Sequence, residues 1–337
     1  MGMARCIFNR LAVRTIPAGF RGIVLWPVLA VLFAGCSLDD DRDLCCPETL
    51  TMHYTYRPYG AEAFGENILS LRHFLFDTDG LFLGELPAGE DLRRQPLNLP
   101  EGTYTMVTVG NMSERSAHRH GDDRLLGQFS LSHEALHDGE IPGLFANTDE
   151  LFWGVKRFAV DTDGRGTELT AGRSAEPANR LQTPMNNIHC HLRVKVEWAN
   201  MPPYVGDYTL ELDGVATAYS LDPDVSSDAG GFIVPQGSRN GIHRLQIPLK
   251  SRELDAEFIT LRYSDNAVPT LRILFGSDQV SPDIDLGKAF TSWGWRPSAT
   301  HVQDYTLLIR LLSNGNADLF PRIEASVTDW INGGTFG

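Results

Sequence analysis

Residues 189–198 read HCHLRVKVEW and carry the clearest strand pattern in the chain. Every second residue from Leu192 to Trp198 is apolar, and charged residues fill the positions between them. Successive side chains of an extended strand point to opposite faces, so one face of this segment is apolar and the other is charged. The stretch therefore predicts a strand that covers a core with one face and meets solvent with the other.

Short segments of the same kind recur on both sides of this stretch. They are rich in β-branched and aromatic residues and are separated by Asp-Gly, Asp-Pro and Asn-Gly pairs, which favour turns. The sequence predicts strands at 49–56, 71–76, 81–83, 95–99, 103–109, 151–161, 208–212, 216–221, 231–235, 243–249, 258–263, 270–275, 305–312 and 323–330. Only two short helical segments are expected, at 61–70 and 131–137. Short strands without a series of amphipathic helices predict an all-β protein built of β-sandwiches.

The chain is long enough for two domains of ordinary size. A polar, glycine-containing stretch from Thr162 to Glu176 is typical of a long hairpin or a linker, and we place the domain boundary just after it. The expected organisation is a signal peptide, a polar tether and two sandwich domains, at residues 1–35, 36–47, 48–183 and 184–337.

The N-terminus has the pattern of a bacterial lipoprotein signal. Four arginines are the only charged residues before Asp39, and an apolar run at 22–33 follows them. This run is too short to stay in a bilayer as a helix, which takes roughly 20 apolar residues. The run closes with Leu-Phe-Ala-Gly-Cys, and the large Phe33 argues against ordinary secretory cleavage before Cys36. The sequence predicts a lipid on Cys36, with an unlipidated secretory signal as the alternative.

The charge of the chain limits its partners. The whole sequence carries −14, and the first 36 residues carry +4, which leaves −18 for the remainder. An acidic body of this kind does not favour nucleic acid as a partner, and an anionic membrane surface would repel it. Attachment to a membrane is therefore expected through the lipid.

Three of the five cysteines remain after removal of the signal and lipidation of Cys36. A disulfide from Cys45 or Cys46 to Cys190 is compatible with an oxidising compartment. Sequence cannot give the geometry that such a bridge needs. We favour a buried, free Cys190 and leave the bridge open.

A zinc-protease motif occurs at 133–137. His133, Glu134 and His137 have the H-E-x-x-H spacing, which on a helix would place both histidines on one face with the glutamate as general base. A glycine and a proline follow closely, at Gly139 and Pro142, whereas such helices need several turns. Zinc catalysis is thus the least favoured function, and the segment is expected to be a short surface helix.

Other candidate binding sites have weaker support in the sequence. His189 and His191 share one face of the expected strand, but no third metal ligand is evident from the sequence. A surface glycan-binding lipoprotein is a further reading, with the pair Trp293 and Trp295 as the best stacking platform. Asp77, Asp79 and Gly80 are better explained by a hairpin turn than by calcium binding. No catalytic residue, cofactor or metal is predicted.

Several motifs occur in a characteristic order. They are Asp43-Leu44-Cys45, the strand ending in Tyr54-Thr55-Tyr56, LRHFLFDTDG at 71–80, LPEGTY at 99–104 and VTDW at 327–330. In this order they resemble the FimB-like family of fimbrial anchor subunits of Bacteroidota. The resemblance runs through most of the first expected domain and returns at the end of the second. Together with the signal, it places this chain close to the anchors of the major and minor fimbria.

The resemblance implies two tandem transthyretin-like β-sandwich domains and an outer-membrane lipoprotein at the base of a type V pilus. It implies pilin subunits as partners, held by strand addition at a sheet edge. It implies no catalytic residues, and the functional residue that it transfers is Cys36. A stalk or tip pilin of the same superfamily is the alternative. Stalk pilins carry a basic cleavage site near the N-terminus, whereas here Arg57 is the first basic residue after Asp43.

Overall fold

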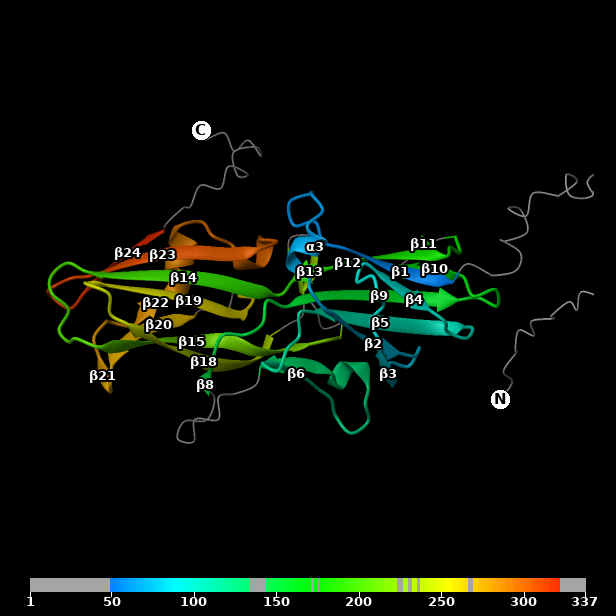
Figure 1. Ribbon diagram of the computed structural model, residues 1–337, viewed down its shortest axis with the longest axis horizontal. Helices are drawn as coiled ribbons and strands as arrows, with labels where there is room; N and C mark the ends of the chain where they lie inside the picture. The colour runs from blue at the N-terminus through cyan, green and yellow to red at the C-terminus, as the bar shows by residue number, and fades with distance from the viewer. Residues whose placement is uncertain are drawn as a thin grey trace, which may run out of the picture. The chain divides into compact units, whose positions relative to one another are not determined.

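The computed structural model describes residues 49–133, 144–170, 173–174, 176–222, 227–229, 232–234, 237–265 and 269–321. The chain divides into two units, residues 1–48 and 49–337, and the second contains every described element. Strands dominate this unit, which confirms the predicted all-β class (Figure 1). Within the part of the chain that the structure describes, no helix has the length and hydropathy to span a membrane.

Two sheets contain most strands of the first half. A three-stranded sheet has the order β12-β1-β4, and a seven-stranded sheet has the order β11-β10-β9-β5-β2-β3, with β13 beside β9. Their bounds are β1 Leu50–Thr55, β2 Leu71–Phe76, β3 Phe82–Leu86, β4 Arg94–Leu97, β5 Gly102–Gly110, β9 Phe152–Val160, β10 Gly166–Thr170, β11 Arg173–Ser174, β12 Arg180–Pro184 and β13 Asn186–Asn187. One buried cluster takes Leu50 and Met52 from the first sheet and Leu75 and Phe158 from the second, so the two sheets pack face to face.

Two further sheets follow in the second half. A four-stranded sheet has the order β19-β14-β23-β24, and an eight-stranded sheet has the order β21-β20-β15-β18-β8, with β22, β6 and β7 attached. Their bounds are β6 Ser116–Arg119, β7 Ser130–His133, β8 Leu144–Phe145, β14 His189–Trp198, β15 Asp207–Ser220, β18 Gly237–Pro248, β19 Glu253–Leu261, β20 Thr270–Phe275, β21 Asp278–Gln279, β22 Ile284–Asp285, β23 Gln303–Leu311 and β24 Ala317–Pro321. The remaining elements are the hairpin β16 Ser227–Ala229 and β17 Phe232–Val234, the α-helices α3 Phe64–Asn67 and α4 Leu286–Ser292, and the 3₁₀ helices η1 Leu126–Gln128 and η3 Pro297–Ala299.

The alternation of residues 189–198 produces the expected burial. The side chains of Leu192, Val194 and Val196 are almost completely buried and form a core with residues of β15, β19, β20 and β23. The charged residues between them lie on the other face of β14. The strand predictions at 71–76, 189–198 and 270–275 agree with β2, β14 and β20 residue for residue.

Strands from before residue 183 also pair with strands from after it. β7 pairs with β15, and β8 pairs with β18. A third buried cluster likewise combines Phe74 and Trp153 with Tyr219 and Leu261. The division into domains at 48–183 and 184–337 stays a prediction.

Three local predictions differ from the structure. Residues 130–133 form strand β7, not the start of a helix, because they pair with β6 on one side and β15 on the other. Residues 116–119, which lie outside every predicted strand, form β6. The two strands expected at 208–212 and 216–221 are one strand, β15, with a register shift between Asp213 and Val215 around Gly214. Gly214 has φ +83°, a conformation that glycine adopts without strain.

Two buried histidines predict a loss of stability in mild acid. His73 and His243 are 1% and 0% exposed, and burial lowers the pKa of each to about 4. In the unfolded chain each histidine takes up its proton near pH 6.5, so the unfolded state binds more protons between pH 6.5 and 4. Each should therefore reduce the free energy of unfolding by about 1.4 kcal/mol per pH unit as the pH falls through this window.

The measurement is the free energy of unfolding in urea at pH 7, 6 and 5, where most carboxylates stay ionised. A His73→Gln/His243→Gln variant should show a shallower dependence than the wild type. Equal slopes for both proteins would refute the assignment to these two rings.

Candidate subunit-contact edge

The structure places the sequence-predicted residues in different parts of the chain. Cys36, Cys45 and Cys46 lie outside the described residues, and so do Glu134 and His137 of the zinc motif. His133 is the last residue of strand β7, opposite Ser116 of β6. An extended backbone at His133 does not provide the helical start on which the motif's geometry depends.

Cys190 is fully buried, and it forms no disulfide with a residue that the structure describes. It belongs to the core of β14, and burial raises the pKa of its thiol. The preference for a buried, free Cys190 is in agreement with this environment.

The tryptophan pair is not an open platform. Trp295 stacks on Tyr305 with ring centroids 4.8 Å apart, and it meets Trp293 edge-on at 5.0 Å. Both tryptophans are half-buried against the core of β14 and β23. The two indole rings pack against the core, so the structure adds no support to the hypothesis of glycan binding.

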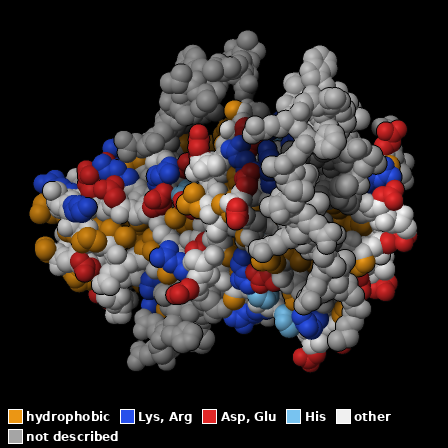
Figure 2. Space-filling view, turned by 45° about the vertical axis from the view of Figure 1, so that its right-hand side comes forward, with side chains coloured by type: hydrophobic (Ala, Val, Ile, Leu, Met, Phe, Trp, Pro, Cys, Tyr) orange, Lys and Arg blue, Asp and Glu red, His pale blue; other side chains and the backbone are white. Residues whose placement is uncertain are grey.

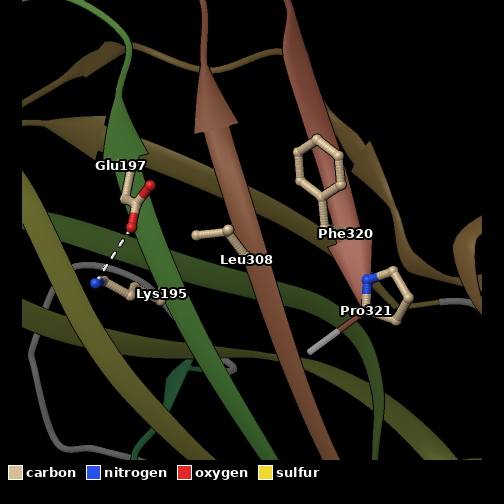
Figure 3. Close-up of a pocket in the computed structure, with 5 residues that line it drawn as sticks. All are labelled: Lys195, Glu197, Leu308, Phe320 and Pro321. Atoms are coloured by element: carbon tan, nitrogen blue, oxygen red, sulfur yellow. Dashed lines mark ion pairs between the residues drawn. The ribbon is translucent and has the colours of Figure 1, made fainter. Parts of the chain in front are cut away.

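A hollow of about 320 Å³ opens on the outer face of the sheet that contains β14, β23 and β24 (Figure 3). Its lining comes from three neighbouring strands: Lys195, Glu197, Leu308, Phe320 and Pro321. Leu308 and Phe320 lie directly opposite each other across β23 and β24, so their side chains share the face. Phe320 is 41% exposed, which is unusual for a large aromatic ring and gives the hollow an apolar wall.

Charged pairs form the other wall of the hollow. Lys195 Nζ lies 2.9 Å from Glu253 Oε2 and 3.2 Å from Glu197 Oε1. Hydrogen bonds to Glu253 and then to Glu197 raise the pKa of Lys195. Acidic and basic side chains are also intermixed on the side of the molecule that Figure 2 shows, with hydrophobic side chains between them. The hollow thus combines an apolar wall with neutralised charges.

The hollow lies beside the last described residues of β24. The described pairing of β24 with β23 runs from Leu307 to Leu311, and Pro321 is opposite Leu307. Proline has no N–H, so Pro321 contributes no donor to this ladder. Among the described residues, no strand pairs with 303–306 on that side of β23. Within the described residues, this side of 303–306 is therefore a strand edge next to an apolar hollow, and edges of this kind can accept an added strand.

The turn before β24 carries a hairpin signal in the sequence. Asn314-Gly315 follows the expected strand at 305–312, and Asn-Gly is a strong hairpin signal. Gly315 has φ +81°, as such a turn requires. The strand was missed because Asp318 and Pro321 are poor strand formers, and a short edge strand tolerates both.

A comparison with family models matches one family. The sequence model of the family described as fimbrillin-A associated anchor proteins Mfa1 and Mfa2 matches residues 42–332. No curated protein matches this chain.

Solved structures give the same fold at low identity. The fimbrial anchor protein Mfa2 from Porphyromonas gingivalis is 13% identical with a TM-score of 0.53, covering 82% of this chain and 98% of that one. A candidate polysaccharide-binding protein from Bacteroides thetaiotaomicron is 13% identical with a TM-score of 0.58, covering 82% and 98%. A candidate adhesin from Bacteroides ovatus is 14% identical with a TM-score of 0.56, covering 82% and 93%.

Proposed function

We propose that this chain is a lipoprotein that fastens fimbriae to the outer membrane. The proposal starts from its family: the chain belongs to the fimbrillin-A associated anchor proteins Mfa1 and Mfa2. The match across residues 42–332 is the observation that carries the proposal. The family is described as one of anchor proteins, and that description names no enzymatic activity. The work assigned to the chain is therefore mechanical.

The membrane end of the anchor is the lipid on Cys36. The apolar run, the small residues before the cysteine and the acidic residues after it support this assignment. Each methylene buried in a bilayer contributes about 0.8 kcal/mol, so several acyl chains hold a protein firmly. The acidic body adds no attraction to an anionic membrane, which leaves the lipid as the attachment.

The fimbrial end of the anchor is assigned to residues 303–306, which pair with no described strand on the β24 side, and to the hollow beside them. A donated strand would pair with the backbone of β23 there and place alternate side chains in the hollow beside Phe320. The partner in this contact is a pilin subunit. Main-chain pairing supplies affinity, and the apolar wall supplies selectivity for an apolar side chain.

A Phe320→Asp substitution tests this contact. Phe320 is partly exposed, so the fold should persist, whereas the apolar wall becomes acidic. Binding of the purified chain to fimbriae sheared from the same cells should weaken about tenfold, which corresponds to about 1.4 kcal/mol. Leu83→Asp is the matched control, because Leu83 is 50% exposed on the edge strand β3 of another sheet. Equal binding by both variants and the wild type would exclude this edge as the contact.

A further inference from the structure

Glu150, His189 and His191 come together beside the first residues of β14. One carboxylate oxygen and one nitrogen from each ring all lie within 4.8 Å of one another. His191 Nε2 is 3.4 Å from Glu150 Oε1. The two rings meet nearly at right angles, with centroids 5.2 Å apart. Two imidazoles and one carboxylate form the donor set of many zinc sites.

The far nitrogen of each ring has a partner that orients it. His189 Nδ1 lies 2.9 Å from the carbonyl oxygen of Leu151, and His191 Nδ1 lies 3.0 Å from Glu257 Oε1. Both oxygens act as acceptors, so each Nδ1 is assigned the proton and each Nε2 keeps its lone pair. A carbonyl or carboxylate on the far nitrogen is the usual support of a metal-bound histidine.

The backbone holds Glu150 in this place. Asn147 donates from its side-chain amide to the carbonyl of Glu257 and accepts from the N–H of Ile259, at 2.8 and 3.0 Å. Thr148 N donates to the carbonyl of Ile259 at 2.8 Å. The segment before Glu150 is thus fixed along β19, the neighbour of β14.

The environment suits a metal that arrives from solvent. His189 is 4% exposed, and burial lowers its pKa to about 4, which keeps the ring neutral. The side chain of Glu150 is 51% exposed. Asn187 Nδ2 lies 3.1 Å from His189 Nε2, a contact that a metal ion would replace. Arg262 also acts on His189 and lowers its pKa.

We propose that Glu150, His189 and His191 bind one divalent transition-metal ion of the zinc class, through a carboxylate oxygen and two Nε2 atoms. A mixed nitrogen and oxygen set favours zinc, cobalt, nickel or copper over magnesium and calcium, which prefer oxygen alone. The ion joins the segment before β9 to β14, which are far apart in sequence. It acts as a cross-link, and this role does not depend on the fimbrial function.

The experiment titrates the full-length, untagged chain, stripped of metal by a chelator, with Zn²⁺ and separately with Co²⁺. One Zn²⁺ should bind per chain and raise the midpoint of thermal unfolding. Bound Co²⁺ should show the visible absorption of nitrogen and oxygen ligands without a thiolate charge-transfer band, which separates this site from the cysteines.

Two variants remove ligands at partly exposed positions. Glu150→Gln and His191→Ala should each weaken Zn²⁺ binding at least tenfold and abolish the thermal shift, whereas Glu257→Gln should weaken binding about tenfold by freeing the far nitrogen of His191. His53→Ala, a half-buried histidine on β1, is the matched control and should bind as the wild type does. Failure to bind Zn²⁺, or wild-type affinity in both ligand variants, overturns the proposal.

Discussion

The Cys36→Ala variant is expected to disappear almost completely from the outer-membrane fraction. Without the thiol no acyl chain can be attached, and the free energy of insertion of those chains is lost. The apolar run at 22–33 is too short to replace them as a stable span. Fractionation of the membranes and metabolic labelling with a fatty acid measure the two effects together.

Neighbouring cysteines provide the control for this experiment. Cys45→Ala and Cys46→Ala remove a thiol from the same region but leave the residues around Cys36 unchanged. Both should keep the fatty-acid label and stay in the outer membrane. An unchanged label on Cys36→Ala would show that the lipid is elsewhere, and an unchanged membrane fraction would show that another feature attaches the chain.

The same variant separates an anchor from a stalk or tip subunit. If the chain is the anchor, cells with Cys36→Ala assemble fimbriae but release them into the medium. Deletion of the gene should give the same release. A stalk or tip subunit gives shorter or fewer fimbriae that stay attached. Intact, attached fimbriae in both strains would refute the anchoring role.

Local sequence patterns were sufficient to predict a strand where one face of that strand is buried along its whole length. β14 alternates apolar and charged residues because one face covers a core, and β20 resembles it. The sequence predicts a short helix at 131–137, but residues 130–133 form strand β7. Pairing with β6 and β15, which are distant in sequence, overrides that local preference.

The candidate sites depend on contacts that no local pattern contains. Glu150 lies 39 residues before His189 and belongs to a connecting segment without periodicity. The hydrogen bonds of Asn147 and Thr148 to β19 bring it to the two histidines. Phe320 similarly forms the apolar wall of the hollow only together with Leu308, its partner on the neighbouring strand. The sequence could therefore predict the two histidines on one face but not their third ligand.

Arg262 is expected to be one of the most sensitive positions for stability. It is 4% exposed, and its guanidinium donates to the backbone carbonyls of Asn187, Pro297, Thr300 and His301. These carbonyls belong to β13 and to the loop around η3, so the side chain of Arg262 holds two separate segments together. Burial lowers the pKa of Arg262, yet a guanidinium stays protonated at neutral pH.

An Arg262→Ala substitution should reduce the free energy of unfolding by about 3–5 kcal/mol. It leaves several buried carbonyls without these donors, at about 1–3 kcal/mol each, and relief of the buried charge offsets part of that loss. Urea unfolding with tryptophan fluorescence measures the change. Arg165→Ala is the control, since Arg165 pairs with Asp161 and Asp163 in an exposed turn, and it should cost no more than about 1 kcal/mol.

Arg262→Met separates the hydrogen bonds from the packing. Methionine fills much of the same volume and removes the desolvated charge, so it isolates the loss of the donors. If the carbonyls need the guanidinium, Arg262→Met stays well below the wild type in stability, although above Arg262→Ala. If Arg262→Met is as stable as the wild type, Arg262 only fills space and other contacts hold the loop around η3. One such contact is the side chain of Gln303, which donates to the carbonyls of Tyr263 and Pro297.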